Sequence, residues 1–166
     1  MKIKLFSYEI ISSIIIMALG TILHFTYDWS NNNYIVGLFS SVNESVWEHL
    51  KLLFFPSLIM IIIGNLIFIK KYPYYICNKT KGLLKGLSFI IIFFYTYTGI
   101  LGKNFPILDI SSFFIAVLIS QISAFKNKDN FSCKYKLGCI LLLIIISFQF
   151  IIFTYKPLNL GIFKTK

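Results

Sequence analysis

Five uninterrupted apolar runs, each long enough to cross a lipid bilayer, constrain this chain more than any other feature. A helix rises about 1.5 Å per residue, so about 20 apolar residues span the hydrocarbon core. The sequence therefore predicts an all-α, polytopic membrane protein, a compact bundle of about five transmembrane helices that forms a single domain over residues 1–166. The expected spans cover residues 5–27, 52–69, 82–101, 107–125 and 137–155.

The composition excludes an ordinary water-soluble domain. Of the 166 residues, 57% are apolar and only 13% are charged, whereas soluble domains carry about 25% charged residues. The net charge is +10, but all 16 basic residues are lysines, and they form short clusters beside the apolar runs. Such clusters are typical of orientation signals and not of a nucleic-acid-binding surface. We therefore expect membrane lipid as a partner and no nucleic acid.

The lysines also predict how the chain crosses the membrane. With the N-terminus in the cytoplasm, the inner segments carry eleven lysines and the outer segments carry five. Because basic residues accumulate on the cytoplasmic side, we expect the N-terminus inside and the C-terminus outside. Cys77, Cys133 and Cys139 then lie at or near the reducing cytoplasmic face, where free thiols are expected.

Residues 41–52, which read SVNESVWEHLKL, contain the most closely spaced informative polar residues in the chain. The spacing allows two overlapping capping boxes, Ser41 with Glu44 or Ser45 with Glu48, and either would start a helix. Pro56 lies further along the same pattern and predicts a kink, because proline has no amide hydrogen to donate. We therefore expect a capped interfacial helix that leads into the second span.

Several side chains of this helix have the spacing of paired groups. Glu44 and Glu48 are four residues apart and would share one face, with Lys51 three residues further on. Trp47 and Lys51 are also four apart, so the ammonium group can rest on the indole ring. The alternative to a binding site is a capped, amphipathic helix with Trp47 in the aromatic belt at the membrane surface.

Polar residues from other segments gather on the same predicted outer side. His24 and Asp28 are four apart at the end of the first span, where the carboxylate can fix the imidazole tautomer. Asp109 begins the fourth span, where it can instead satisfy free backbone amides. Ionisable groups at membrane depth are costly unless paired or hydrated, which favours a binding site. The candidate ligand-binding residues are His24, Asp28, Asn43, Glu44, Trp47, Glu48, His49, Lys51 and Asp109.

Two histidines with carboxylates can hold a divalent cation such as Zn²⁺. The metal ligands would be His24, Asp28, Glu48 and Asp109, and a metal-dependent hydrolase at the outer leaflet is the alternative function. Against this, the chain has no HExxH spacing, and adjacent Glu48 and His49 point about 100° apart on a helix. We therefore expect no cofactor. The favoured function is a non-enzymatic membrane protein that binds a small ligand, a lipid headgroup or a partner, including a second copy.

The stretch from Val42 to Leu52 (VNESVWEHLKL), preceded by residues 24–29, resembles an uncharacterised family of small multi-pass membrane proteins from anaerobic Gram-positive bacteria. Residues 108–110 (LDI) and 153–164 (FTYKPLNLGIFK) show the same resemblance, which covers nearly the whole chain. The family is a domain of unknown function. The resemblance thus implies a bacterial plasma membrane and supports the helix count, but it implies no activity.

Overall fold

The computed structural model describes residues 4–126 and 135–165, and within these ranges the chain is helical without any strand. Five of the helices are long and apolar enough to span a membrane, which confirms the all-α class and the expected number of spans. The elements are α1 (Leu5–Trp29), α2 (Tyr34–Gly37), α3 (Val46–Phe68), α4 (Tyr75–Leu101), α5 (Pro106–Lys126), α6 (Lys136–Tyr155) and the short 3-10 helix η1 (Gly161–Phe163).

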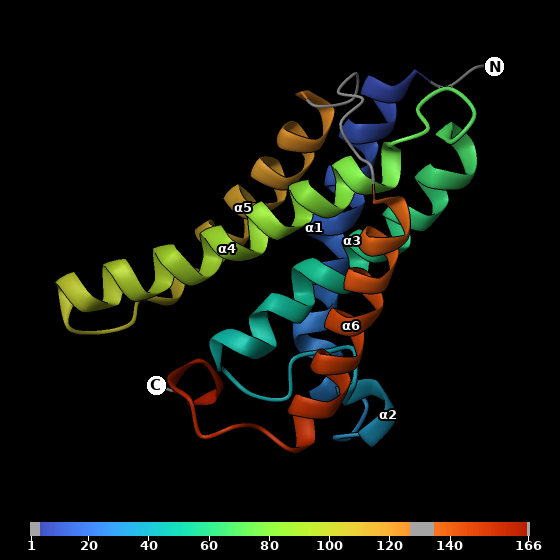
Figure 1. The fold of residues 1–166 in the computed structure, drawn as a ribbon. Helices are drawn as coiled ribbons and strands as arrows, with labels where there is room; N and C mark the ends of the chain where they lie inside the picture. Colours follow the sequence, from blue (N-terminus) through green and yellow to red (C-terminus); the bar gives the residue numbers. More distant parts are fainter. Residues whose placement is uncertain (1–3, 127–134, 166) are drawn as a thin grey trace.

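The bundle has two distinct ends (Figure 1). The short helix α2, the first turn of α3 and the end of α6 lie at one end, which we call the α2 end. The start of α1 lies at the opposite end, together with the end of α3 and the start of α4. The α2 end corresponds to the side that the sequence predicts to be outer.

Two helices begin earlier than the apolar runs indicate. Helix α3 starts at Val46 and continues through Pro56 to Phe68, so the predicted interfacial helix is the first part of α3 itself. Helix α4 starts at Tyr75, seven residues before the predicted span. The apolar runs mark only the hydrocarbon-compatible part of each helix, whereas backbone hydrogen bonding continues through the polar turns that precede it.

Small residues bring α4 and α5 into close contact. A Cβ atom added at Gly82 would lie 2.4 Å from the carbonyl oxygen of Ser120, and one added at Gly86 would lie 2.8 Å from that of Ala116. Small residues four apart are the usual means by which membrane helices pack closely. The GxxxG spacing of α4 therefore serves packing within the chain.

A second close contact joins three helices at Gly20 of α1. A Cβ atom added there would lie 2.5 Å from the ring of Phe113 on α5 and 2.7 Å from the carbonyl oxygen of Leu52 on α3. The Leu52 carbonyl would normally bond the amide of residue 56, which is a proline. Helix α1 thus packs against α3 at the carbonyl group that Pro56 leaves without its helical donor.

The cysteines differ from the sequence-based expectation at one position. Cys77 on α4 is disulfide-bonded, although the sequence predicted a free thiol. Spacing along the chain does not show which segments the fold brings together, which is why the pattern gave no sign of a bond. Cys133 lies outside the described residues.

Candidate functional site

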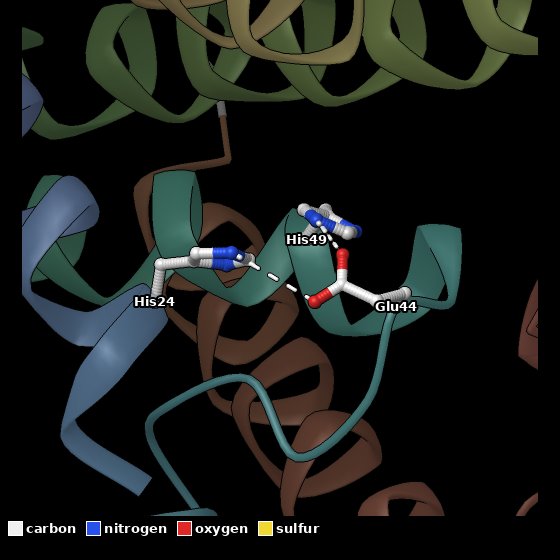
Figure 2. Close-up of side chains that lie close together, drawn as sticks. All are labelled: His24, Glu44 and His49. Atoms are coloured by element: carbon white, nitrogen blue, oxygen red, sulfur yellow. Dashed lines mark ion pairs between the residues drawn. The ribbon is translucent and has the colours of Figure 1, made fainter. Parts of the chain in front are cut away.

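Three side chains from separate segments converge at the α2 end. His24 comes from α1, Glu44 from the connection before α3, and His49 from the first part of α3 (Figure 2). The Glu44 carboxylate faces both rings, with Oε2 at 3.3 Å from His49 Nε2 and Oε1 at 3.8 Å from His24 Nε2. One potential metal-ligand atom from each residue lies within 4.8 Å of the others. We call these residues the His–Glu–His cluster.

The orientation of His49 limits what its second nitrogen can do. Its Nδ1 lies 2.9 Å from the carbonyl oxygen of Ser45, and because a carbonyl only accepts hydrogen bonds, Nδ1 must carry a hydrogen. In the neutral ring, Nε2 is then an acceptor that faces the carboxylate of Glu44, another acceptor. This arrangement requires a positive charge between them, either a second ring proton or a metal ion.

His24 is held mainly by packing. Its ring makes an edge contact with Phe25 and lies 5.4 Å from the ring of His49, measured between centroids. Its Nδ1 is buried and has no hydrogen-bond partner in the part of the chain that the structure describes. Nδ1 therefore does not anchor the ring, whose Nε2 faces Glu44.

Glu44 is the most accessible member of the cluster, with 67% of its side chain exposed. The hydrogen bond with His49, assisted by the charges of His49 and His24, holds the pKa of its carboxyl group below the usual value of 4.5, and partial burial opposes this effect. Glu44 is therefore a carboxylate at neutral pH and can serve as an anionic ligand.

The segment before α3 is built by local hydrogen bonds, and these settle which capping box forms. The Ser45 hydroxyl accepts a hydrogen bond from the Glu48 amide at 3.4 Å, so Ser45 caps α3 as one of the two boxes predicts. The Ser45 amide, however, bonds Asn43 Oδ1 at 2.9 Å and not the Glu48 carboxylate. The alternative box of Ser41 with Glu44 does not form, and Ser41 donates to the Asn43 carbonyl oxygen instead. Asn43 therefore shapes the loop.

Glu48 and Lys51 form a buried ion pair beneath this loop. The side chains are 2% and 0% exposed, and Lys51 Nζ lies 2.6 Å from Glu48 Oε2. Lys51 also donates to the Gly37 carbonyl oxygen and to Thr154 Oγ1, each at 2.9 Å, while Glu48 accepts from the Val42 amide at 3.0 Å. The structure thus pairs Glu48 with Lys51 and leaves it outside the group of three ligand atoms from His24, Glu44 and His49.

Trp47 also has a different role from the expected ones. Its indole ring packs against Phe150 and Phe153 of α6 and Phe163 of η1, with centroids 4.6, 5.7 and 4.8 Å apart. The Lys51 ammonium group is engaged with Glu48, and the Trp47 side chain is partly buried among these aromatic rings. Its aromatic partners lie about 100 residues further along the chain, beyond the reach of a local pattern.

The two remaining acidic candidates have different environments. Asp28 is exposed, and within residues 4–126 and 135–165 the acidic partner of His24 is Glu44. Asp109 Oδ1 accepts a hydrogen bond of 2.5 Å from the Tyr97 hydroxyl. Asp109 also lies close enough to His49 to act on its ring electrostatically. Of the two, only Asp109 belongs to the surroundings of the cluster.

Sequence reasoning missed a second buried ion pair, which lies toward the opposite end of the bundle. Lys79 Nζ lies 2.6 Å from Glu9 Oε2 and also donates to Gln121, so the group joins α4, α1 and α5. Lys79 is one of the eleven lysines expected in the inner segments. A signal was present, because Lys79 shares a helix face with Gly82 and Gly86 at spacings of three and seven residues.

A protein-family model matches residues 2–166 of the chain. The chain belongs to DUF6512, a family of unknown function. No curated protein and no solved structure matches it. Membership of DUF6512 confirms the expected assignment to an uncharacterised family and assigns no activity, so the role of the cluster is argued from its geometry.

Proposed function

We propose that this DUF6512 protein is an integral membrane protein that binds a divalent metal ion of the Zn²⁺ class through His24, Glu44 and His49. One observation carries the proposal: three ligand atoms from separate segments lie within 4.8 Å of one another. Two imidazole rings and a carboxylate form a donor set that suits Zn²⁺ and similar transition metals better than Mg²⁺ or Ca²⁺.

The distances fit this proposal with little adjustment. Zn–N and Zn–O bonds of about 2.0–2.1 Å place tetrahedral ligand atoms about 3.3–3.4 Å apart. Glu44 Oε2 lies 3.3 Å from His49 Nε2, which is close to this value, whereas the other oxygen, Oε1, lies 3.8 Å from His24 Nε2. The three ligand atoms lie within 4.8 Å of one another, so they would move closer when an ion binds. The bond from His49 Nδ1 to a backbone carbonyl is also the outer contact that metal-bound histidines commonly make.

The same geometry argues against an anionic lipid headgroup as the ligand. The Glu44 carboxylate faces the Nε2 atoms of both rings, so a phosphate bound by the imidazoles would meet a like charge there. A metal-dependent hydrolase is the second candidate function. It is supported by the number of ligands, because three protein ligands leave a fourth position for water or substrate.

The test is metal binding by the full-length protein in lipid nanodiscs. We expect elemental analysis and calorimetry with Zn²⁺ to give one ion per chain, and His24→Ala, Glu44→Gln and His49→Ala each to weaken binding about tenfold or more. Asp28→Asn is the matched control, since this carboxylate is four residues from His24 but exposed. Absence of stoichiometric Zn²⁺ binding by the parent protein would refute the proposal.

We further propose that the α2 end faces the outside of a bacterial plasma membrane. Lys51 and Lys79 are buried in ion pairs and do not act as surface charges, which leaves ten lysines on the predicted inner side and four on the outer. The disulfide of Cys77 favours the reverse, because disulfides persist in oxidising compartments.

Impermeant maleimide on intact cells separates these orientations, with Asn32→Cys and Lys70→Cys placed singly in a cysteine-free protein. Both positions are exposed, at the α2 end and the opposite end respectively. We expect labelling at position 32 alone. Labelling at position 70 alone would reverse the assignment.

A further inference from the structure

We infer that Asp109 of α5 completes the metal site as a fourth ligand. The inference rests on the proposed function, since it assigns one more residue to the same site. It also decides between the two candidate functions, because a site filled by four protein ligands has no open position for hydrolysis.

The first step is the three-helix contact at Gly20. There the Phe113 ring of α5 and the Leu52 carbonyl oxygen of α3 lie so close to Gly20 of α1 that an added Cβ atom would meet both at less than van der Waals distance. Side chains one turn away on the same helix faces point to the same side of the bundle as these contacts.

The second step is what each helix carries one turn toward the α2 end. On α1, His24 is four residues after Gly20; on α5, Asp109 is four residues before Phe113. On α3, His49 is three residues before Leu52. Residues three or four apart share a helix face. The register of the three helices thus puts two imidazoles and one carboxylate on the same side of this contact, and Glu44 joins the imidazoles from the loop.

The third step is that Asp109 can be released to a metal ion at low cost. Its partner, the Tyr97 hydroxyl, also contacts Asn104 Oδ1, so the hydroxyl keeps an acceptor when the carboxylate turns away. Asp109 lies outside the three-residue ligand group, although it is near enough to His49 to act on it electrostatically. Ligation by Asp109 would require a change of its side-chain rotamer and an approach of α5 toward α1 and α3.

With Asp109 as a ligand, the ion would have no open coordination position and would link α5 to α1 and α3. Two imidazoles and two carboxylates would supply four protein ligands, which is the number found in structural Zn²⁺ sites. The ion would then hold the α2 end of the bundle together, and metal binding would report on the packing of α5.

The experiment compares Asp109→Asn with the parent protein, both in nanodiscs. The amide keeps the size of the side chain and an acceptor for Tyr97, but it loses the negative charge. We expect Zn²⁺ affinity to fall about tenfold or more. In Co²⁺-loaded protein, azide should alter the visible spectrum of the variant, which has an open position, and leave that of the parent unchanged.

Two controls separate ligation from packing. Asp28→Asn should match the parent. Tyr97→Phe should also keep the parent's affinity, because the carboxylate remains; a loss equal to that of Asp109→Asn would show that the pair acts through helix packing and would overturn the inference. Thermal unfolding in EDTA reports whether each variant folds, and Asp109→Ser replaces the amide variant if that one does not.

Failure of the proposed Zn²⁺ site and failure of the fourth ligand give different results. If the parent protein binds no Zn²⁺, the proposed function fails and the inference fails with it. If the parent binds Zn²⁺, Asp109→Asn binds equally well, and azide alters both Co²⁺ spectra, the three-ligand site stands and Asp109 is no ligand. That last result would favour the hydrolase.

Discussion

Replacing Lys51 by methionine should destabilise the protein more than any other single lysine substitution at the α2 end. The methionine keeps most of the length and apolar volume of the side chain, so the packing changes little. What is lost is the ammonium group, which donates to Glu48, to the Gly37 carbonyl oxygen and to Thr154. The Glu48 carboxyl group, 2% exposed, then stays buried without a cationic partner, although the Val42 amide still donates to it.

Removing one partner of a buried ion pair costs about 3–5 kcal/mol, because the other charge is left uncompensated. For a chain of this size, each kcal/mol lowers the unfolding midpoint by about 2–4 °C, so the expected decrease is about 6–20 °C. Lys156→Met is the matched control, since Lys156 is exposed near the same end, and a surface substitution changes stability by no more than about 0.5 kcal/mol.

The measurement is thermal unfolding in nanodiscs with EDTA present, followed for the parent, both lysine variants, Glu48→Gln and the double variant Glu48→Gln/Lys51→Met. We expect the double variant to be more stable than Lys51→Met alone, because it carries no unpaired buried charge. The coupling between the two positions should be about 0.5–3 kcal/mol. Additive effects, or a midpoint for Lys51→Met equal to that of Lys156→Met, would refute the reasoning that the pair is buried and mutually compensating.

Two further predictions use the same unfolding assay. In metal-free protein, the pKa of Glu44 is lower in the folded state than its usual value of 4.5, so Glu44 should stabilise the fold at pH values above 4.5. This contribution is lost as the pH falls through the folded pKa. The parent and Glu44→Gln should therefore differ in unfolding midpoint at neutral pH and converge in acid. A constant difference at all pH values would contradict this. Gly82→Ala should destabilise by about 1–3 kcal/mol, because its Cβ would meet the Ser120 carbonyl oxygen of α5 at 2.4 Å. Gly99→Ala is its control, with no neighbouring atom within 4 Å of the added Cβ, and equal midpoints for the two variants would contradict the packing argument.

The helices could be predicted from the sequence because hydrocarbon is the environment of most of the chain, and apolar runs show this directly. The partners of the polar residues could not be predicted, and Glu44 and Glu48 show the reason. Treating both as residues of one helix places them on a single face. Ser45 caps the helix, however, so α3 begins at Val46. Glu44 is therefore outside the helix and free to turn toward His24, while Glu48 turns inward to Lys51.

The segment from Glu44 to Lys51 thus contains two interleaved pairs with different tasks. Glu48 and Lys51 face inward and stabilise the fold, whereas Glu44 and His49 face the cluster. The pairs are connected, because Glu48 accepts from the Val42 amide and so fixes the loop that carries Glu44. Disrupting the inward pair should therefore weaken metal binding even though neither of its residues is proposed as a ligand. The four residues are close in sequence because one short loop and the first two turns of α3 both position Glu44 and His49 and anchor the loop through Glu48 and Lys51.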